Sequence, residues 1–267
     1  MKIKQKNTID MTHGTLWNKL LIFALPLAAS SILQQLFNSV DTAVVGRFAS
    51  SRALAAVGSN SSLIALMINL FIGISLGSNV IISRYIGQKA EEHVKGAIHT
   101  AIVVALCSGI FVLVLGQFIA RPVLTLMGTP KDVIDLAVLY LRIYFLGMPF
   151  IMLYDFSSSI LRSIGDSRRP LYALIVAGII NTGLNLILVI VFHLGVSGVA
   201  IATVVSNIVS SGILFYILLH EQEPIRVSLS GLSIDWGELK KNPDHWRSCR
   251  SAGHGLFPCQ RLHPEHD

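Results

Sequence analysis

Residues 96–120 read GAIHTAIVVALCSGIFVLVLGQFIA, a stretch without Asp, Glu, Lys or Arg. A helix needs about 20 mostly apolar residues to cross the roughly 30 Å of hydrocarbon in a bilayer. This stretch is long enough. Because lipid offers no partner for backbone N–H and C=O groups, the stretch must cross as a helix. It therefore predicts an integral membrane protein.

Five further stretches of the same kind surround this one. They lie at residues 20–42, 54–82, 133–160, 170–192 and 196–219. The connections between them are short and carry Gly, Pro and charged residues, which are typical of turns. We therefore expect an all-α fold with six transmembrane helices between residues 20 and 219.

The bulk composition agrees with this fold class. Charged residues make up 13% of the 267-residue chain, and the mean hydropathy is +0.64. A soluble domain carries about 25% charged residues. The net charge of +6 is spread over short loops, with no basic patch of the kind that binds nucleic acid. The lipid bilayer is the expected partner.

Motifs of soluble enzymes are missing from the sequence. It has no Walker loop, dinucleotide-binding fingerprint, zinc-protease helix or nucleophile elbow. We expect no catalytic residues, no metal site and no cofactor. An ion gradient is then the expected source of energy, and the coupling ion would be Na⁺ or H⁺.

The distribution of Lys and Arg predicts the orientation. Most of them fall on one side of the expected membrane, namely Lys2, Lys4, Lys6, Lys19, Arg84, Lys89, Lys95, Arg162, Arg168, Arg169, Arg226, Lys240 and Lys241. The other side has only Arg47, Arg52, Arg121 and Lys131. The positive-inside rule places the N-terminus and the end of the sixth span in the cytoplasm. We expect a multi-pass protein of the inner (cytoplasmic) cell membrane.

The first span carries the richest set of polar residues. Gln34, Asn38 and Asp41 follow a spacing that puts them on one helical face. Ionisable residues inside a membrane are functional candidates by default, so Asp41 is expected to bind a cation or proton, with Asn38 and Gln34 lending polar contacts. The alternative is that Asp41 only ends the helix at the headgroups. Pro26 is expected to bend or open this helix because it lacks a backbone donor.

Two other spans contain polar residues. Asn181 and Asn185 lie one helical turn apart in the fifth span, where they either line a cavity or bond between helices. Asp155 lies in the fourth span and is expected to pair with Arg162. The sequence suggests no partner for Asn69, Asn79 or Asn207.

Three motifs, in order and at their spacing, resemble the multidrug and toxic compound extrusion (MATE) family. The first span reads LP at residues 25–26 and QQLFNSVDT at 34–42. The second span is followed by SRYIGQK at residues 83–89. The fourth span runs from GMPF at residues 147–150 to LRSIGDSRRP at 161–170. The resemblance covers about residues 12–239.

The resemblance implies a proton- or sodium-coupled antiporter that expels small cationic drugs. It implies twelve helices in two six-helix lobes, with alternating access to the cleft between them. The acidic residue that the family uses for cation coupling matches Asp41. Asn181 and Asn185 match the family's fifth-helix positions, where some members carry an acid at the second. Together with Gln35 they are expected to line the cavity of the lobe.

The apolar pattern stops at Lys241. We expect a cytoplasmic N-terminus at 1–19, a six-helix lobe at 20–219, a cytoplasmic linker at 220–241 and an aberrant, disordered tail at 242–267. The tail's His and Cys residues match no known zinc pattern. The codons of Lys240, Lys241 and Asn242 are adenine-rich, and a shifted frame permits an apolar helix that aligns with the first span. A frameshift that removes the second lobe is therefore expected.

The chain is thus expected to be the N-terminal lobe of a MATE-type efflux antiporter, inactive alone. A lipid-linked oligosaccharide flippase of the same superfamily is one alternative. Such flippases need cationic cavity residues, and only Arg142 lies deep in a span. A non-transporting half-lobe is the other alternative.

Overall fold

The computed structural model describes residues 16–221 and 225–227, with side chains from residue 21 onward. The predictions for residues 1–15, for most of the linker 220–241 and for the tail 242–267 lie outside these described residues. Within the described residues every regular element is helical. The predicted all-α fold is confirmed.

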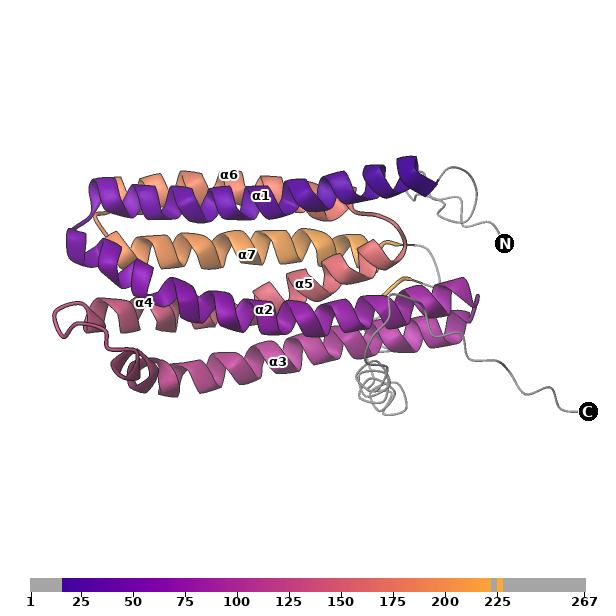
Figure 1. Ribbon diagram of the computed structural model, residues 1–267, viewed down its shortest axis with the longest axis horizontal. Coiled ribbons are helices and arrows are strands. Elements are labelled where there is room, and N and C mark those ends of the chain that lie inside the picture. Colours follow the sequence, from indigo (N-terminus) through magenta and orange to yellow (C-terminus); the bar gives the residue numbers. More distant parts are fainter. Residues whose placement is uncertain (1–15, 222–224, 228–267) are drawn as a thin grey trace, which may run out of the picture.

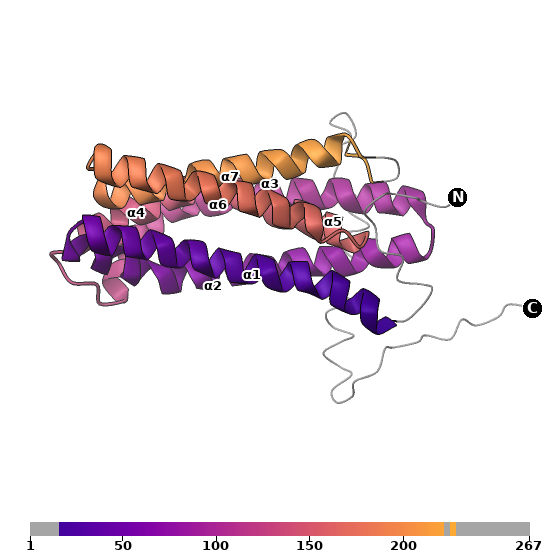
Figure 2. The same ribbon diagram turned by 90° about the horizontal axis from the view of Figure 1, so that it is seen from above.

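The helices follow one another as a bundle. They are α1 (Leu16–Phe48), α2 (Ser51–Gly87), α3 (Glu91–Leu126), α4 (Ile134–Leu146), α5 (Met148–Ser163), α6 (Arg168–Leu186), the π-helix η1 (Ile187–Val191) and α7 (Gly195–Leu219). Figures 1 and 2 show them lying along the long axis of the molecule. Figure 1 places α1 and α6 at one edge and α3 at the opposite edge. We call the end where α1 begins the N-terminal end of the lobe.

The helices are long and apolar enough to cross a membrane. By length and composition, α1, α2, α3, α6 together with η1, and α7 each qualify, and the bent pair α4 and α5 makes a sixth if it is taken as one span. Helices lie at all six predicted positions, with ends within a few residues of the predicted bounds.

The fourth span differs from its prediction as one continuous helix over 133–160. It is broken after Leu146, and α4 and α5 meet at an angle of 48°. Pro149 follows the break, lacks a backbone N–H and cannot sit in a straight helix interior. The Gly147 carbonyl instead accepts from the N–H groups of Phe150 and Ile151, both at 3.0 Å, and so restarts the helix.

Glycines let the helices approach closely at this break. A Cβ on Gly109 of α3 would lie 2.5 Å from the Pro149 backbone, and one on Gly116 would lie 2.3 Å from the Phe145 ring. Close packing through small residues is the usual way membrane helices associate. The bent span is therefore held against α3 by contacts that only glycine permits.

A ladder of hydrogen bonds joins α2 to α5. Three side chains at successive turns of α2 donate to main-chain carbonyls of α5: Ser75 to Asp155 at 3.0 Å, Asn79 to Ser159 at 2.9 Å and Ser83 to Ser163 at 3.4 Å. Asn79, which had no partner in the sequence interpretation, therefore bonds between helices.

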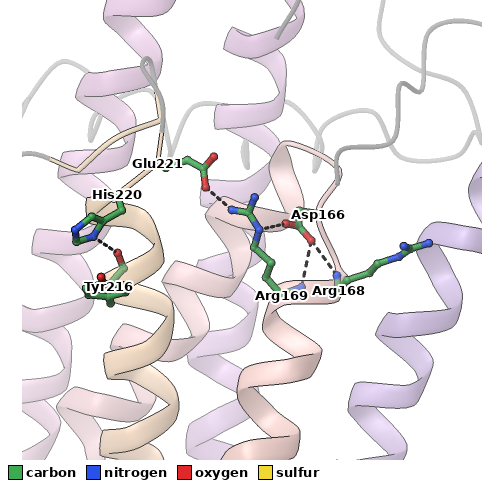
Figure 3. A network of polar contacts seen from close by, with 6 residues as sticks. All are labelled: Asp166, Arg168, Arg169, Tyr216, His220 and Glu221. Atoms are coloured by element: carbon green, nitrogen blue, oxygen red, sulfur yellow. Dashed lines mark hydrogen bonds and ion pairs between the residues drawn. The ribbon is translucent and has the colours of Figure 1, made fainter. Parts of the chain in front are cut away.

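An ionic network closes the N-terminal end of the lobe (Figure 3). Asp166 is fully buried, and its Oδ1 accepts from the backbone N–H groups of Arg168 and Arg169 at 3.0 and 3.2 Å, which caps α6. Its Oδ2 lies 2.9 Å from Nε of Arg169. Arg169 also pairs with Glu221, just beyond α7. Ser167 donates to the Phe23 carbonyl of α1 at 3.1 Å. The network thus ties α6, α7 and α1 together.

Replacing Gly109 tests the close approach of α3 to the bent span. We expect Gly109→Ala to lower the thermal unfolding midpoint of the purified chain in detergent, because the contacting atoms are backbone and cannot move aside. Overpacking of this kind costs about 1–3 kcal/mol. Gly73→Ala is the matched control, since its Cβ would meet nothing within 4 Å. Circular dichroism follows the unfolding. Equal unfolding midpoints for the two variants would contradict the close packing of Gly109 against Pro149.

Asp166→Ala tests the network at the N-terminal end. We expect a loss of about 1–3 kcal/mol, because the variant removes the cap of α6 and one buried partner of Arg169. Asp135→Ala serves as the control. Asp135 pairs with Arg121 at 3.0 Å, but both side chains are more than half exposed, and such pairs contribute roughly 0–1 kcal/mol. Chemical denaturation of both variants measures the difference, and similar losses would refute it.

Candidate functional site

The carboxylate of Asp41 is the centre of the candidate site. Asp41 lies near the end of α1 that is far from the N-terminal end, and it is only 8% exposed. Asn185 of α6 donates from Nδ2 to Asp41 Oδ1 at 2.5 Å. The Thr203 hydroxyl of α7 lies 3.5 Å from Asp41 Oδ2. Three helices therefore meet at one buried acid.

A second amide extends the site along α6. Asn185 also donates from Nδ2 to Asn181 Oδ1 at 3.1 Å. Both asparagines are buried, and Asn185 Oδ1 has no hydrogen-bond donor among the described residues. The site thus gathers carboxylate, amide and hydroxyl oxygens, which suit a hard cation or a proton.

The packing of α1 on α6 positions these groups. Gly178 of α6 faces Phe37 so closely that a Cβ there would lie 1.8 Å from the ring. Phe37 lies one turn before Asp41 on α1, and Gly178 lies about one turn before Asn181 on α6. The glycine therefore lets α1 approach α6 just where the carboxylate must reach the amides.

Two tyrosines of α4 lie near the acid. Tyr140 and Tyr144 are buried, and their rings stack with centroids 6.2 Å apart. The charge of Asp41 acts electrostatically on both of them.

The other polar residues of α1 lie apart from this cluster. Gln34, Gln35 and Asn38 are exposed on the surface of the bundle. In the part of the chain that the structure describes, no hydrogen bond joins their side chains to Asp41. Their predicted contributions to cation coupling and to the cavity stay predictions. The helix α1 continues without interruption through Pro26, and the bending assigned to Pro26 also stays a prediction.

Sequence reasoning missed Thr203, Tyr140 and Tyr144. All three are neutral and lie in apolar stretches with many similar residues, so no pattern distinguished them. It also expected Asp155 and Arg162 to pair. The two interact electrostatically but form no direct ion pair, and Asp155 Oδ2 and Arg162 Nε are both buried without a hydrogen-bond partner. The two residues lie seven apart along one helix, beyond the three- or four-residue spacing at which helical side chains meet.

Comparison with known proteins shows which family has this architecture. Residues 26–187 match the protein family described as MatE. The "Probable multidrug resistance protein YoeA" of Bacillus subtilis is 36% identical over 223 residues, which are 82% of this chain and 48% of that protein. The "Multidrug export protein MepA" of Staphylococcus saprophyticus is 25% identical over 85% of this chain and 51% of its own length. The chain spans about half the length of the curated relatives it matches.

Solved structures show the same fold. "Crystal structure of MATE in the bent conformation" superposes with a TM-score of 0.79 at 24% identity, covering 86% of this chain and 51% of that one. "Outward-facing conformation of a multidrug resistance MATE family transporter of the MOP superfamily" gives a TM-score of 0.77 over 84% and 50%. The described bundle therefore has the fold of half a MATE transporter, as the sequence predicted.

Replacing Asn185 tests the buried contact of the site. We expect Asn185→Leu to destabilise the purified chain by about 1–3 kcal/mol, because it leaves the buried Asp41 carboxylate without its amide donor. Asn38→Leu is the matched control and should change the unfolding midpoint little, since Asn38 is exposed. If Asn38→Leu is the more destabilising of the two, the site has been placed on the wrong face of α1.

Proposed function

This chain belongs to the MatE family, and we propose that it forms the N-terminal lobe of a cation-coupled multidrug efflux antiporter. Two relatives are named as a multidrug resistance protein and a multidrug export protein. The six apolar spans suit a lipid bilayer. The observation that carries the proposal is the buried Asp41, which accepts from Asn185 of α6 and has the Thr203 hydroxyl of α7 3.5 Å away.

The proposed role of Asp41 is to bind the coupling ion, Na⁺ or H⁺. Its carboxylate and the free acceptor Oδ1 of Asn185 offer oxygen ligands within one buried cluster. Binding of a cation neutralises Asp41 and weakens its charge-assisted bond from Asn185, because such bonds are stronger when one partner is ionised. An ion and a drug that favour different arrangements of α1 then oppose one another by reciprocal linkage.

The drug-contacting surface is proposed to lie on the exposed polar face of α1. Gln34, Gln35 and Asn38 present amide groups there. They are next to the ion cluster along the helix, so a change at Asp41 is transmitted to them over only one or two turns. Small cationic organic drugs are the proposed substrates, and Asn181 and Asn185 are proposed to line the same lobe.

Alternating access requires a second wall. The six described spans supply one lobe, and we propose that a second lobe, encoded in a shifted frame after Lys241, supplies the other. The N-terminus is proposed to be cytoplasmic, 220–241 to be the linker and 242–267 to be the product of the frameshift. The chain as it stands is then expected not to transport.

Export assays test the function. A gene with the frame restored across the codons of residues 240–242 is expressed in a bacterial strain that lacks its own efflux pumps. We expect it to lower ethidium accumulation, and Asp41→Asn in that gene to abolish the effect because the coupling carboxylate is lost. Asp135→Asn, which alters an exposed ion pair, should leave export intact.

The unaltered 267-residue chain is measured in the same cells. Export by this chain alone would refute the need for a second lobe, and export by the Asp41→Asn gene would refute the coupling role. Imposing a sodium or a proton gradient in turn on vesicles that contain the frame-restored protein distinguishes the two coupling ions.

A further inference from the structure

Asp155 is an acid that the Asp41 site does not use. It lies on α5, in the half of the lobe toward the N-terminal end, and its Oδ2 is buried without a hydrogen-bond donor among the described residues. The Ser158 hydroxyl and Nε of Arg162 are likewise buried and unpartnered. These three residues fall at i, i+3 and i+7, which is one face of a helix. A row of unsatisfied polar groups therefore follows α5 toward the N-terminal end.

The neighbouring hydroxyls do not satisfy this carboxylate. Ser75 of α2 donates to the main-chain carbonyl of Asp155 at 3.0 Å, and Ser159 donates to the main-chain carbonyl of Ser75 at 2.7 Å. The hydroxyls of Ser75 and Ser159 are thus already bonded to main-chain carbonyls. The helices pack closely around Asp155, yet they leave its Oδ2 unbonded.

Neutralisation by a neighbouring charge is also incomplete. Arg162 attracts Asp155 electrostatically but makes no direct ion pair with it. Tyr144 on α4 and Tyr154 on α5 are neutral neighbours that sense its charge. On α6, Arg169 already pairs with Asp166 and Glu221. The buried titratable side chains of the described residues, besides the partly buried Asp155, are Asp41, His99, Asp166, Tyr140, Tyr144 and Tyr154.

The helices α3, α2 and α7 complete these surroundings. On α3, His99 is buried and already has an interaction of its own. The buried polar side chains of α2 and α7 are serines and one asparagine, all of them neutral. Arg162 is therefore the charge that bears most directly on Asp155.

Ionising a carboxylate is unfavourable when one of its oxygens is buried without a donor, as Asp155 Oδ2 is in the described part of the chain. A proton removes the charge and converts one oxygen into an O–H donor. The Ser158 hydroxyl, one turn along the same face, has no partner among the described residues and does not bond to Asp155, and a hydroxyl can accept from such an O–H group. We propose that Asp155 is a second, reversible proton-binding site, separate from the Asp41 cluster, which exchanges its proton with water at the N-terminal end along the face carrying Ser158 and Arg162.

This site goes beyond the proposed function, because it binds a proton whether or not the lobe exports drugs. The step is balanced: the carboxylate takes one proton from water that enters from the N-terminal end and returns it to the same water.

Infrared difference spectroscopy of the purified 267-residue chain in lipid nanodiscs tests the site without any transport. With ¹³C-labelled aspartate, the carbonyl-stretch band of a protonated carboxyl should appear and vanish reversibly with pH. Because a proton on Asp41 would give the same band, the comparison is made in a chain that carries Asp41→Asn throughout. There we expect the band to remain, Asp155→Asn to remove it and Asp155→Glu to replace it with an unlabelled band. Arg162→Gln should shift the pH at which it appears. Circular dichroism confirms that each variant is folded.

The exchange route has a matched pair of variants. Ser157 is as buried and unpartnered as Ser158 but points to another side of α5. After transfer into D₂O, Ser158→Ala should slow the isotope shift of the Asp155 band, and Ser157→Ala should not. In the Asp41→Asn chain, a band that survives Asp155→Asn, or the absence of any such band while Asp155 is present, overturns the site. If Asp155→Asn does not fold, a pH-independent spectrum of the labelled wild-type chain overturns it instead. Equal exchange in the two serine variants overturns the route.

Discussion

Hydrocarbon offers no hydrogen-bond partner, and this constraint shapes the lobe at every level. It makes each long apolar stretch a helix, because only a helix satisfies its own backbone. It also favours hydrogen bonds from polar side chains to main-chain carbonyls. Ser30, Ser39 and Thr42 of α1 donate to the carbonyl one turn back in the same helix, and the α2 ladder donates across to α5. Glycines such as Gly109 and Gly178 allow the helices to pack closely.

Some of the exceptions to this constraint lie at the two buried acids. Among the described residues, Asn185 Oδ1, Asp155 Oδ2 and Ser158 Oγ are buried without a hydrogen-bond partner, and so are Asn60 Oδ1, Ser157 Oγ, Arg162 Nε and Asp166 Oδ2. Buried polar atoms are satisfied in the great majority of cases, so each exception calls for an explanation. At Asp41 the free acceptor belongs to the residue that already holds the carboxylate, whereas at Asp155 it belongs to the carboxylate itself. The first arrangement suits ligation of a cation and the second suits uptake of a proton.

The lengths of the apolar stretches predicted the positions of the six spans well, because a helix must be long and apolar to cross a membrane. Asp41 was identified because it is the only acidic residue in the first span. The spacing of Asn181 and Asn185 predicted their shared face. The break before Pro149 was missed because the sequence on both sides stays apolar, so hydropathy reads through it. Thr203 was missed because a neutral hydroxyl in a helix of similar residues carries no signal. The helical spacing of Gln34, Asn38 and Asp41 predicted a shared direction, but only tertiary packing decides that Asp41 meets α6 while the other two stay exposed.

The contacts that attach α1 to the bundle determine how a change at Asp41 would move this helix. Within the described residues, α1 packs mainly on α6. At the N-terminal end, Ser167 donates to the Phe23 carbonyl, and toward the far end the Phe37–Gly178 contact and the Asp41–Asn185 bond hold the helix. Of these, only the Asp41 bond depends on charge. Neutralising Asp41 therefore weakens one attachment and leaves the others unchanged, which favours a hinge movement of α1 about its N-terminal end over its release from the bundle. The amides of Gln34 and Asn38 lie between these attachments, on the segment that such a movement would displace.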